Sequence, residues 1–499
     1  MTAWTDHREI FEEGKKIFQE LQSRTEPLKN KDRISIPRQA MPTQEPEARA
    51  GNLCEVSIGF SQEQAVVEAM RCLDCKTEPC VAGCPVSIDI PGFIKKVSEQ
   101  DFSGAAEVIK RTSLLPAICG RVCPQETQCE EVCTVGKSKK TISQSVAIGG
   151  LERFVADWEQ DSDLINTPKV KAATKKKVGV IGSGPAGLVV AADVRREGHE
   201  VVLFEAFHKL GGVMRYGIPE FRLPNSVVDQ EISILKKMGV EFQLNTVVGR
   251  TRKIEDLLNK DGFDALFVGS GAGLPLFMGI PGEERVGVFA ANEYLTRANL
   301  MRAYDKEHAD TPIYASKKVV VLGGGNVAMD ASRMALRLGA ETVSVVYRRT
   351  LEEMPARREE IEHAMEEGIE FRFLENLLQI DGGEDGRVTS CKVQRYKLGE
   401  ADDSGRRRPM AIEGDTFEIP VDTVIIAIGN GSNPLIKQTT PNLETNRRGN
   451  LVVDKSGKTN LEGVFAGGDI VLGAATVILA MGEGRKAASS INAMLASNP

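Results

Sequence analysis

Cysteines are gathered in one part of the chain. Nine of the ten cysteines lie before residue 134, and residues 71–85 read RCLDCKTEPCVAGCP. The first group has the spacing Cys72-x2-Cys75-x4-Cys80-x3-Cys84, and the second has Cys119-x3-Cys123-x5-Cys129-x3-Cys133. Each group contains a Cys-Pro pair. Such crowding leaves four uses open, namely disulfides, zinc, iron–sulfur clusters and reactive thiols.

The cellular compartment in which we expect the protein limits the possible uses of the cysteines. The first twenty residues, MTAWTDHREIFEEGKKIFQE, carry charges throughout and no apolar segment, so we expect no secretory signal. The longest uncharged apolar run, residues 178–192, is too short for a membrane span and is interrupted by Ser183 and Pro185. We therefore predict a cytoplasmic protein, not membrane-bound, whose thiols stay reduced, which disfavours disulfides. Zinc is the main alternative to iron–sulfur clusters, because cysteines two residues apart also build zinc ribbons.

A glycine-rich turn follows the cysteine region. Residues 178–206, VGVIGSGPAGLVVAADVRREGHEVVLFEA, read as strand, turn, helix and strand, with Gly182, Gly184 and Gly187 in the turn. Glycines there permit a tight turn and let a pyrophosphate approach the helix N-terminus closely. Glu205 ends the second strand and can accept both hydrogen bonds of a ribose diol. We favour a dinucleotide site over a purely structural turn.

A second copy of this unit occupies residues 319–349. It reads VVVLGGGNVAMDASRMALRLGAETVSVVYRR, with Gly323 and Gly325 in the turn. Here the strand ends in Arg348 and Arg349 instead of an acid. Guanidinium groups pair with a 2′-phosphate, whereas a carboxylate would repel it. We predict an NADP(H) site, the alternative being a solvated basic edge.

A late Gly467-Gly468-Asp469 sequence supports FAD at the first turn. An aspartate there can bond the flavin ribityl chain, and a helix from about Ala474 would direct its N-terminus at the flavin ring. The alternative is that Asp469 is a helix N-cap. The predicted FAD-binding residues are Gly182, Gly184, Pro185, Ala186, Gly187, Glu205, Gly212, Arg222, Val248, Gly271, Gly468, Asp469, Ala475 and Thr476. The predicted NADP-binding residues are Gly323, Gly325, Asn326, Val327, Arg348 and Arg349. No catalytic side chain beyond the flavin is expected.

Length and composition fit an α/β protein of two or three domains. The chain has 499 residues, of which 41% are apolar and 27% charged. Its net charge of −7 gives no support for nucleic-acid binding. We predict an N-terminal helical iron–sulfur domain (1–170) followed by two Rossmann-like dinucleotide-binding domains. The FAD domain comprises residues 171–287 and 431–499, and the NADP(H) domain (288–430) is inserted in it. Residues 165–177 read as a linker and DDSGRRRP (402–409) as an exposed loop.

At this point several motifs resemble one family. RCLDC, LPAICGRVCPQ, AIGGLERF, VGVIGSGPAGL and the final AGGD resemble the small subunit of NADPH-dependent glutamate synthase. They resemble equally the large subunit of NADH-dependent ferredoxin:NADP oxidoreductase, and the N-terminal half of dihydropyrimidine dehydrogenase shares the layout. The resemblance covers nearly the whole chain from about residue 60. The first 60 residues and residues 273–301 are more similar to the ferredoxin:NADP oxidoreductase type.

The resemblance implies two [4Fe–4S] clusters. Cys72, Cys75, Cys80 and Cys133 would hold one cluster, and Cys84, Cys123, Cys129 and Glu152 the other. The alternative for Glu152 is an exposed helix carboxylate. Cys119 matches a position that is not a ligand and is expected to be a buried thiol, while Cys54 and Cys391 are expected to be structural.

The implied function is electron transfer between NADPH, FAD and the clusters. The expected partner is a second redox subunit, either a small flavin/iron–sulfur subunit working with ferredoxin or a large glutamate synthase chain. No residues are left over for an amidotransferase domain. Whether the flavin splits an electron pair between two acceptors is left open. A contrasting hypothesis is a zinc-binding, non-enzymatic scaffold, against which Glu205, Asp469 and Arg348 argue.

Overall fold

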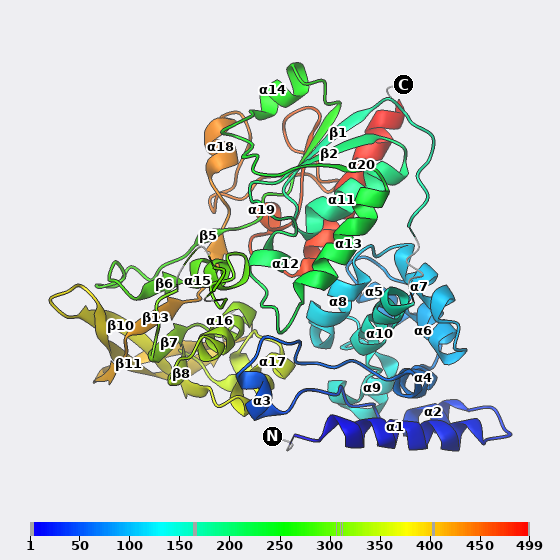
Figure 1. Cartoon of the computed structure of the whole chain (residues 1–499), viewed down its shortest axis with the longest axis horizontal. Helices are drawn as coiled ribbons and strands as arrows, with labels where there is room; N and C mark the ends of the chain where they lie inside the picture. The colour runs from blue at the N-terminus through cyan, green and yellow to red at the C-terminus, as the bar shows by residue number, and fades with distance from the viewer. Residues whose placement is uncertain are drawn as a thin grey trace.

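The computed structural model describes residues 4–162, 167–305, 307–309, 311, 313–401 and 405–497. A helical region holds the N-terminal third, and two parallel sheets lie beside it (Figure 1). Within these residues, no helix combines the length and the apolarity that crossing a membrane requires.

Short helices separated by cysteine-containing loops make up the first region. They are α1 (His7–Gln22), α2 (Asn30–Ser35), α3 (Pro46–Ala50), α4 (Gln62–Met70), α5 (Pro79–Ala82), α6 (Ile90–Ser98), α7 (Phe102–Lys110), α8 (Pro116–Val122), α9 (Thr134–Lys139) and α10 (Ile148–Asp161). Side-chain caps stabilise the N-termini of several of these helices. Ser61 and Gln64 form a capping box at α4, and Asp89 accepts a hydrogen bond from the third residue of α6.

The first sheet is parallel, with the strand order β15-β4-β1-β2-β3. Its strands are β1 (Lys177–Ile181), β2 (Glu200–Phe204), β3 (Glu241–Gln243), β4 (Ala265–Val268) and β15 (Val464–Ala466). Helices α11 (Pro185–Arg196), α13 (Asn225–Lys237) and α20 (Val477–Ser497) pack on one face (Figure 1). The other face is covered by α14 (Ile254–Asn259), α18 (Leu435–Thr439) and α19 (Asp469–Leu472). Residues on this sheet are buried on both sides, as parallel strands require.

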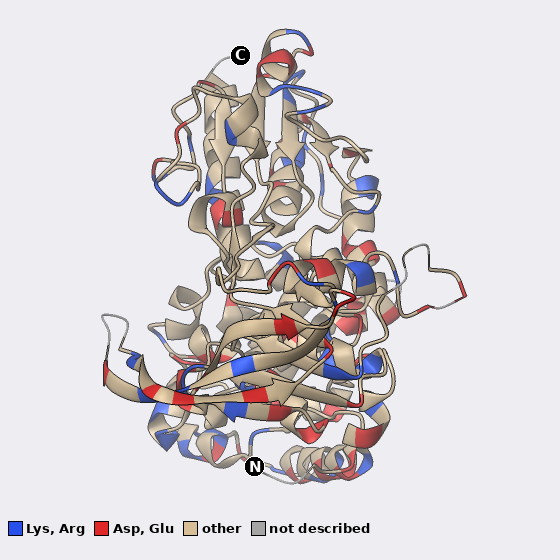
Figure 2. Ribbon diagram, turned by 90° about the vertical axis from the view of Figure 1, so that its left-hand side faces the viewer, with Lys and Arg blue, Asp and Glu red and all other residues tan. Residues whose placement is uncertain are grey.

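The second sheet is also parallel, with the order β6-β13-β7-β8-β9. Its strands are β6 (Val288–Ala290), β7 (Lys318–Leu322), β8 (Thr342–Tyr347), β9 (Glu370–Phe373) and β13 (Thr423–Ile426). Helices α15 (Ala291–Asn299), α16 (Asn326–Arg337) and α17 (Arg358–Glu366) cover one face. An antiparallel sheet of β10 (Glu375–Gly382), β11 (Val388–Ala401) and β12 (Arg407–Pro420) covers the other (Figure 2).

The chain order agrees with the predicted fold class. All strands of the second sheet lie in the sequence between β4 and β15, so the first sheet is interrupted by the second. A two-stranded ribbon of β5 (Leu274–Pro275) and β14 (Asn430–Gly431) joins the two at this crossing. The α/β class with an N-terminal helical region is confirmed, while the boundaries that we placed at residues 170, 287 and 430 stay predictions.

Two local expectations need correction. The last helix begins at Val477 and not at about Ala474, because a separate short helix, α19, and a glycine precede it. Residues 407–409 of the expected loop belong to strand β12, where they pair with β11. Residues 402–404 of that loop and 165–166 of the linker lie outside the described residues.

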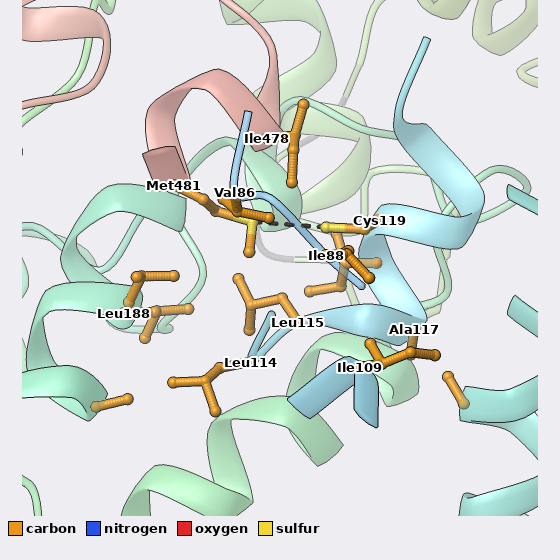
Figure 3. Packing of buried hydrophobic residues seen from close by; sticks show 14 of the residues in the cluster. Val86, Ile88, Ile109, Leu114, Leu115, Ala117, Cys119, Leu188, Ile478 and Met481 are labelled. Carbon is orange, nitrogen blue, oxygen red and sulfur yellow. Dashed lines mark hydrogen bonds between the residues drawn. The ribbon is translucent and has the colours of Figure 1, made fainter. Parts of the chain in front are cut away.

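One apolar core runs from the helical region into the first sheet. Val86, Ile88, Leu115 and Cys119 lie in the same cluster as Leu188 of α11 and Ile478 and Met481 of α20 (Figure 3). Burial of this shared surface holds the cysteine loops against the first nucleotide-binding domain.

Candidate functional site

The first glycine turn is built for close packing, with one open position. A Cβ atom at Gly182, whose φ is +99°, would lie 2.5 Å from the carbonyl oxygen of Gly269. A Cβ atom at Gly187 would lie 1.9 Å from the carbonyl oxygen of Gly182. By contrast, no atom lies within 4 Å of a Cβ atom at Gly184. This open space lies at the N-terminus of α11, where Pro185 and Ala186 start the helix and a pyrophosphate fits.

Glu205 follows strand β2 and also holds the first glycine turn in place through hydrogen bonds. Its carboxylate accepts hydrogen bonds from the Ser183 backbone N–H at 2.9 Å, from the Ser183 hydroxyl, and from the Phe207 N–H at 2.9 Å. The Ser183 hydroxyl in turn accepts the Gly211 N–H at 2.9 Å. Sequence reasoning missed Ser183, and its only signal was a small hydroxyl residue between two turn glycines.

Other predicted FAD residues converge on the same turn. A Cβ atom at Gly212 would lie 2.7 Å from Cα of Gly184, and one at Gly468 would lie 3.0 Å from Cβ of Ala186. Gly271, in the loop after β4, has a φ of +72° and open space around it. The structure therefore brings Gly212 and Gly468 into contact with the turn and leaves room near Gly271.

Asp469 is the first residue of α19, not a helix N-cap, because Gly468 holds that cap position. Burial raises the pKa of Asp469 to about 7, although a hydrogen bond from the Ala475 backbone N–H acts to lower it. Burial likewise raises the pKa of Tyr216 to about 12, with smaller contributions from Asp469 and Glu205. Tyr216 thus lies near both carboxylates, a placement that the sequence did not indicate. Thr476 directly precedes α20, and its hydroxyl accepts the Leu479 N–H at 3.4 Å.

Two predicted FAD residues lie elsewhere. Nη1 of Arg222 donates to both carboxylate oxygens of Asp330, at 2.7 and 2.8 Å, and Nε lies 3.2 Å from Glu360. Asp330 and Glu360 belong to α16 and α17 of the second nucleotide-binding domain. Val248 is buried in the core beneath the first sheet. These contacts give Arg222 and Val248 structural roles that need no nucleotide. Their assignment to FAD stays a prediction.

The second glycine turn repeats the first. Gly323 has a φ of +144°, and a Cβ atom there would lie 2.3 Å from the carbonyl oxygen of Ala427. No atom lies within 4 Å of a Cβ atom at Gly325. Asn326 begins α16 and accepts the Arg357 N–H at 2.9 Å, while the Val327 side chain is 38% exposed. The open space again lies at a helix N-terminus.

The two arginines after β8 differ from each other. Arg348 is exposed and takes part in no ion pair with any residue that the structure describes. Arg349 is buried, and its Nε donates to the carbonyl oxygen of Arg407 at 2.8 Å. Arg348 is therefore accessible to a ligand, whereas Arg349 also bonds to the antiparallel sheet.

The first predicted cluster has its four cysteines around one cavity. Cys72, Cys75, Cys80 and Cys133 line it, with apolar neighbours such as Ile90 and Val146. Burial raises the pKa of Cys72 to about 11 and that of Cys80 to about 12, and the nearby cysteines add to both shifts. Four thiols that converge on one cavity fit a metal cluster, which takes them as thiolates.

The second predicted set is centred on a buried carboxyl group. Glu152 is 6% exposed, and its Oε1 has no hydrogen-bond partner among the described residues. Burial raises the pKa of Glu152 to about 8. Electrostatic interactions with Glu152 extend to Cys84, Cys123 and Cys129, so all four side chains are close together. The alternative of an exposed helix carboxylate is wrong, and an unpaired buried oxygen beside three cysteines fits a cluster ligand.

Zinc and a four-iron cluster need different spacings of their ligands. In the described ranges, no group of three or more His, Cys, Asp or Glu side chains lies close enough to hold a single metal ion. All ligands of zinc lie about 2.0–2.3 Å from the same ion, whereas a four-iron cluster takes each ligand at a different iron and needs a wider cage.

The remaining cysteines take different places. Cys119 is fully buried, and its Sγ lies 3.5 Å from Sδ of Met481 in α20 (Figure 3). A hydrogen bond with Cys123 and complete burial raise the pKa of Cys119 well above the usual range. Cys391 is buried between the second sheet and the antiparallel sheet. Cys54 is exposed, and the expectation that it is structural stays a prediction.

Comparisons with known proteins agree with this division. Residues 49–164 match the family described as dihydropyrimidine dehydrogenase domain II, 4Fe-4S cluster, and residues 176–484 match the pyridine nucleotide-disulphide oxidoreductase family. The glutamate synthase (NADPH) small chain of Halomonas elongata is 36% identical over 92% of this chain and 96% of that one. The corresponding chain of Escherichia coli is 37% identical over 92% of this chain and 97% of that one.

A solved structure shares part of the fold. FprA from Mycobacterium tuberculosis has a TM-score of 0.54 and 20% identity, over 65% of this chain and 85% of that one, and it has also been solved in complex with NADPH. This likeness concerns the fold alone. The family matches and the relatives that align almost end to end lead to one conclusion: the chain belongs to the pyridine nucleotide-disulphide oxidoreductases and, among them, to the family of the glutamate synthase (NADPH) small chain.

Proposed function

We propose that the chain is an NADP(H)-dependent FAD/iron–sulfur oxidoreductase subunit that moves electrons between NADPH and a partner protein. The turn at residues 182–187 would hold FAD and the turn at residues 323–328 would hold NADP(H). Cys72, Cys75, Cys80 and Cys133 would hold one [4Fe–4S] cluster, and Cys84, Cys123, Cys129 and Glu152 the other. When bound, the flavin accepts hydride and the clusters accept single electrons.

The observation that carries this proposal is the position of α20. A Cβ atom at Gly482 would lie 2.9 Å from the carbonyl oxygen of Pro85, the residue after Cys84. Two residues on, a Cβ atom at Gly484 would lie 2.7 Å from the carbonyl oxygen of Ala186 in the FAD turn. One helix therefore contacts a predicted cluster loop and the predicted FAD site at once. Glycines at both points permit this close approach, which suits electron transfer over a short distance.

The chain's own residues have defined tasks in this scheme. Glu205 and Ser183 hold the FAD turn in shape, while Arg348 binds the charge that distinguishes NADPH from NADH. Partial or complete burial of the cysteines would limit the access of water to the clusters. No side-chain acid or base is needed, since orientation and electrostatics suffice for hydride transfer.

The test is anaerobic purification followed by cofactor analysis and reduction with NADPH. We expect flavin, iron and acid-labile sulfide in the protein, and bleaching of the flavin absorbance by NADPH. A Glu152→Ala variant should retain flavin and lose part of its iron and sulfide. Zinc alone, or a flavin that NADPH leaves oxidised, would refute the proposal.

The partner has two candidates. The end-to-end match to glutamate synthase small chains favours a large glutamate synthase chain. The similarity of the first 60 residues and of residues 273–301 to the ferredoxin:NADP oxidoreductase type favours a small flavin/iron–sulfur subunit. Co-purification from the native cell separates them by the size and cofactors of the associated chain. We also propose a cytoplasmic location, where the cysteines that would hold the clusters stay reduced.

A further inference from the structure

The N-terminus of α17 is hydrogen-bonded to the second glycine turn. The Ala356 N–H donates to the carbonyl oxygen of Gly324 at 3.2 Å. The N–H of Arg357, the N-cap residue of α17, donates to Oδ1 of Asn326 at 2.9 Å. Asn326 begins α16 beside the open position at Gly325. Both donors are backbone groups, so these bonds do not depend on the side chain at position 357.

The side chain of Arg357 is bonded to the helical region instead. Its Nη1 donates to the carbonyl oxygen of Arg121 at 3.0 Å, and its Nη2 donates to Oε1 of Gln125 at 3.3 Å. The guanidinium is paired with Glu359 at 2.9 Å and with Glu126 at 3.5 Å. Its side chain is 10% exposed, so water competes little for these bonds. One residue therefore joins the second glycine turn to the helical region.

Gln125 contacts two elements that carry predicted ligands of the second cluster. It follows Cys123 by two residues, and its Nε2 donates to the carbonyl oxygen of Cys119 at 3.2 Å. The same Nε2 lies so close to Gly149 that a Cβ atom there would clash with it. Gly149 belongs to α10, one turn before Glu152. A displacement of the Gln125 side chain would therefore reach the Cys123 loop and the helix of Glu152.

The interface around Arg357 leaves room for such a displacement. Helix α17 lies where the second nucleotide-binding domain meets the helical region (Figure 1). A cavity of about 460 Å³ lies there, lined by charged side chains from both sides, among them Arg121, Glu126, Arg333 and Glu360. Polar interfaces between the domains of one chain permit relative motion. The FAD domain, by contrast, shares an apolar core with the helical region.

We infer that Arg357 and Gln125 are positioning residues that couple the second nucleotide site to the second cluster, so that a nucleotide at the turn changes the midpoint potential of that cluster. The inference rests on the proposed function, because it assumes NADP(H) at the turn and a cluster at the set that includes Glu152. A contiguous series of hydrogen bonds leads from the turn to the cluster loop. A phosphate at the N-terminus of α16 draws the Arg357 guanidinium away from this loop. The loss of nearby positive charge disfavours reduction.

The test is an anaerobic redox titration of the protein carrying its flavin and clusters, followed by electron paramagnetic resonance. Adenosine 2′,5′-bisphosphate is the probe, because it offers a phosphate to the turn and has no nicotinamide to reach the flavin. The second cluster is identified as the one whose signal changes in Glu152→Cys. In the wild type, saturating bisphosphate should lower the equilibrium constant for reduction of this cluster by about fivefold to tenfold. A tenfold change corresponds to about 59 mV for one electron.

Arg357→Met and Gln125→Met remove side-chain bonds between the two regions and keep the backbone bonds to the turn. Both variants should still bind the bisphosphate, and each should show about a third of the wild-type shift or less. Arg357→Lys keeps the charge with fewer donors and should keep part of the shift. Arg358→Gln is the matched control, because Arg358 is the next residue and is exposed. It should show the full shift.

The outcomes separate this inference from the proposed function. If the wild type binds the bisphosphate without a change in potential, or if the full shift persists in Arg357→Met and Gln125→Met, these residues do not couple the two sites. If the wild type has no cluster signal or does not bind the bisphosphate, the proposed function itself is wrong. Should Arg357→Met fail to fold, Arg357→Lys carries the test, because it keeps the buried charge.

Discussion

The turns at residues 182–187 and 323–328 can be compared position by position. Both begin with a glycine at positive φ whose missing side chain lets a neighbouring carbonyl approach, at Gly182 and Gly323. Both leave open space at the third position, Gly184 and Gly325. The strand ends differ. Glu205 is buried and bonded to its own turn, whereas Arg348 is exposed and faces solvent.

This comparison separates two parts of nucleotide binding, the backbone of the turn and the charge at the strand end. The backbone of the turn provides a site for any dinucleotide, since pyrophosphate binding depends on N–H groups and on the absence of side chains. In the proposed function, the strand end then selects the nucleotide through its charge. The second domain adds a hairpin that returns to the strand end, an element for which the first sheet has no equivalent among the described strands.

The largest effects are expected from filling the open positions. Gly184→Val should prevent FAD binding, and Gly325→Val should prevent reduction by NADPH while the flavin stays bound. Each should weaken its nucleotide by roughly 100-fold or more, or about 3 kcal/mol. Both variants should fold, because no atom lies within 4 Å of the added Cβ. Flavin content and NADPH titration measure the result, and loss of the same cofactor in both variants would contradict the comparison.

Removing the strand-end charge of the second site should act on one nucleotide only. Arg348→Ser should raise the Michaelis constant for NADPH by about 10- to 100-fold, as expected for a charged hydrogen bond, with little change for NADH. Arg349→Ser should also lower the melting temperature, because Arg349 is buried and bonded to Arg407. Equal changes for both nucleotides would show that the arginines do not bind the 2′-phosphate.

The corresponding change at the first site is Glu205→Gln. It replaces a carboxylate that accepts from Ser183 and Phe207. We expect FAD affinity to fall by about tenfold, since charged hydrogen bonds become neutral ones. Equilibrium dialysis against FAD measures this, and NADPH binding serves as the internal control. An unchanged FAD affinity would show that the acid at this strand end has no part in nucleotide binding.

Asp469 gives the first site a pH dependence. Its pKa of about 7 in the folded protein lies above the ordinary value of 3.8. The folded state therefore holds the proton more tightly, and the stability that this confers is lost as pH rises from about 4 to about 7. Relative to the wild type, Asp469→Asn should raise the free energy of unfolding of the flavin-free protein increasingly over this range, by about 1–2 kcal/mol above pH 7 after allowance for partial exposure. A difference in unfolding free energy between variant and wild type that does not change with pH would refute the raised pKa of Asp469.

The smallest effects should come from single hydrogen bonds behind each turn. Tyr347→Phe removes the bond to the Glu353 carbonyl, and Ser183→Ala removes the hydroxyl bond to the Glu205 carboxylate. The first should cost about 1 kcal/mol and the second about 1.5 kcal/mol. Tyr347→Phe should weaken only NADPH, and Ser183→Ala only FAD, in the same binding assays. If Tyr347→Phe also weakens FAD binding, or Ser183→Ala also weakens NADPH binding, the two turns are coupled.

Sequence spacing was informative wherever the strand, turn and helix of one nucleotide-binding unit follow one another in the chain. Strand, turn and helix follow one another at residues 178–206 and 319–349, and the hydrophobic and glycine pattern placed both units. It was uninformative wherever distant segments meet. Arg222, which we predict to bind FAD, pairs with Asp330 and Glu360 of the second domain, and no spacing in the sequence indicated these partners.

The sequence by itself determined the α/β class, the two nucleotide turns and the division of the chain, because each depends on residues close together along the backbone. Only the tertiary structure decided the burial of Glu152 among three cysteines, the contact of Cys119 with Met481 and the return of the hairpin to Arg349. These partners are far apart in the chain, by 362 residues for Cys119 and Met481 and by 58 for Arg349 and Arg407. Their contacts arise from the packing of whole elements, which local spacing does not encode.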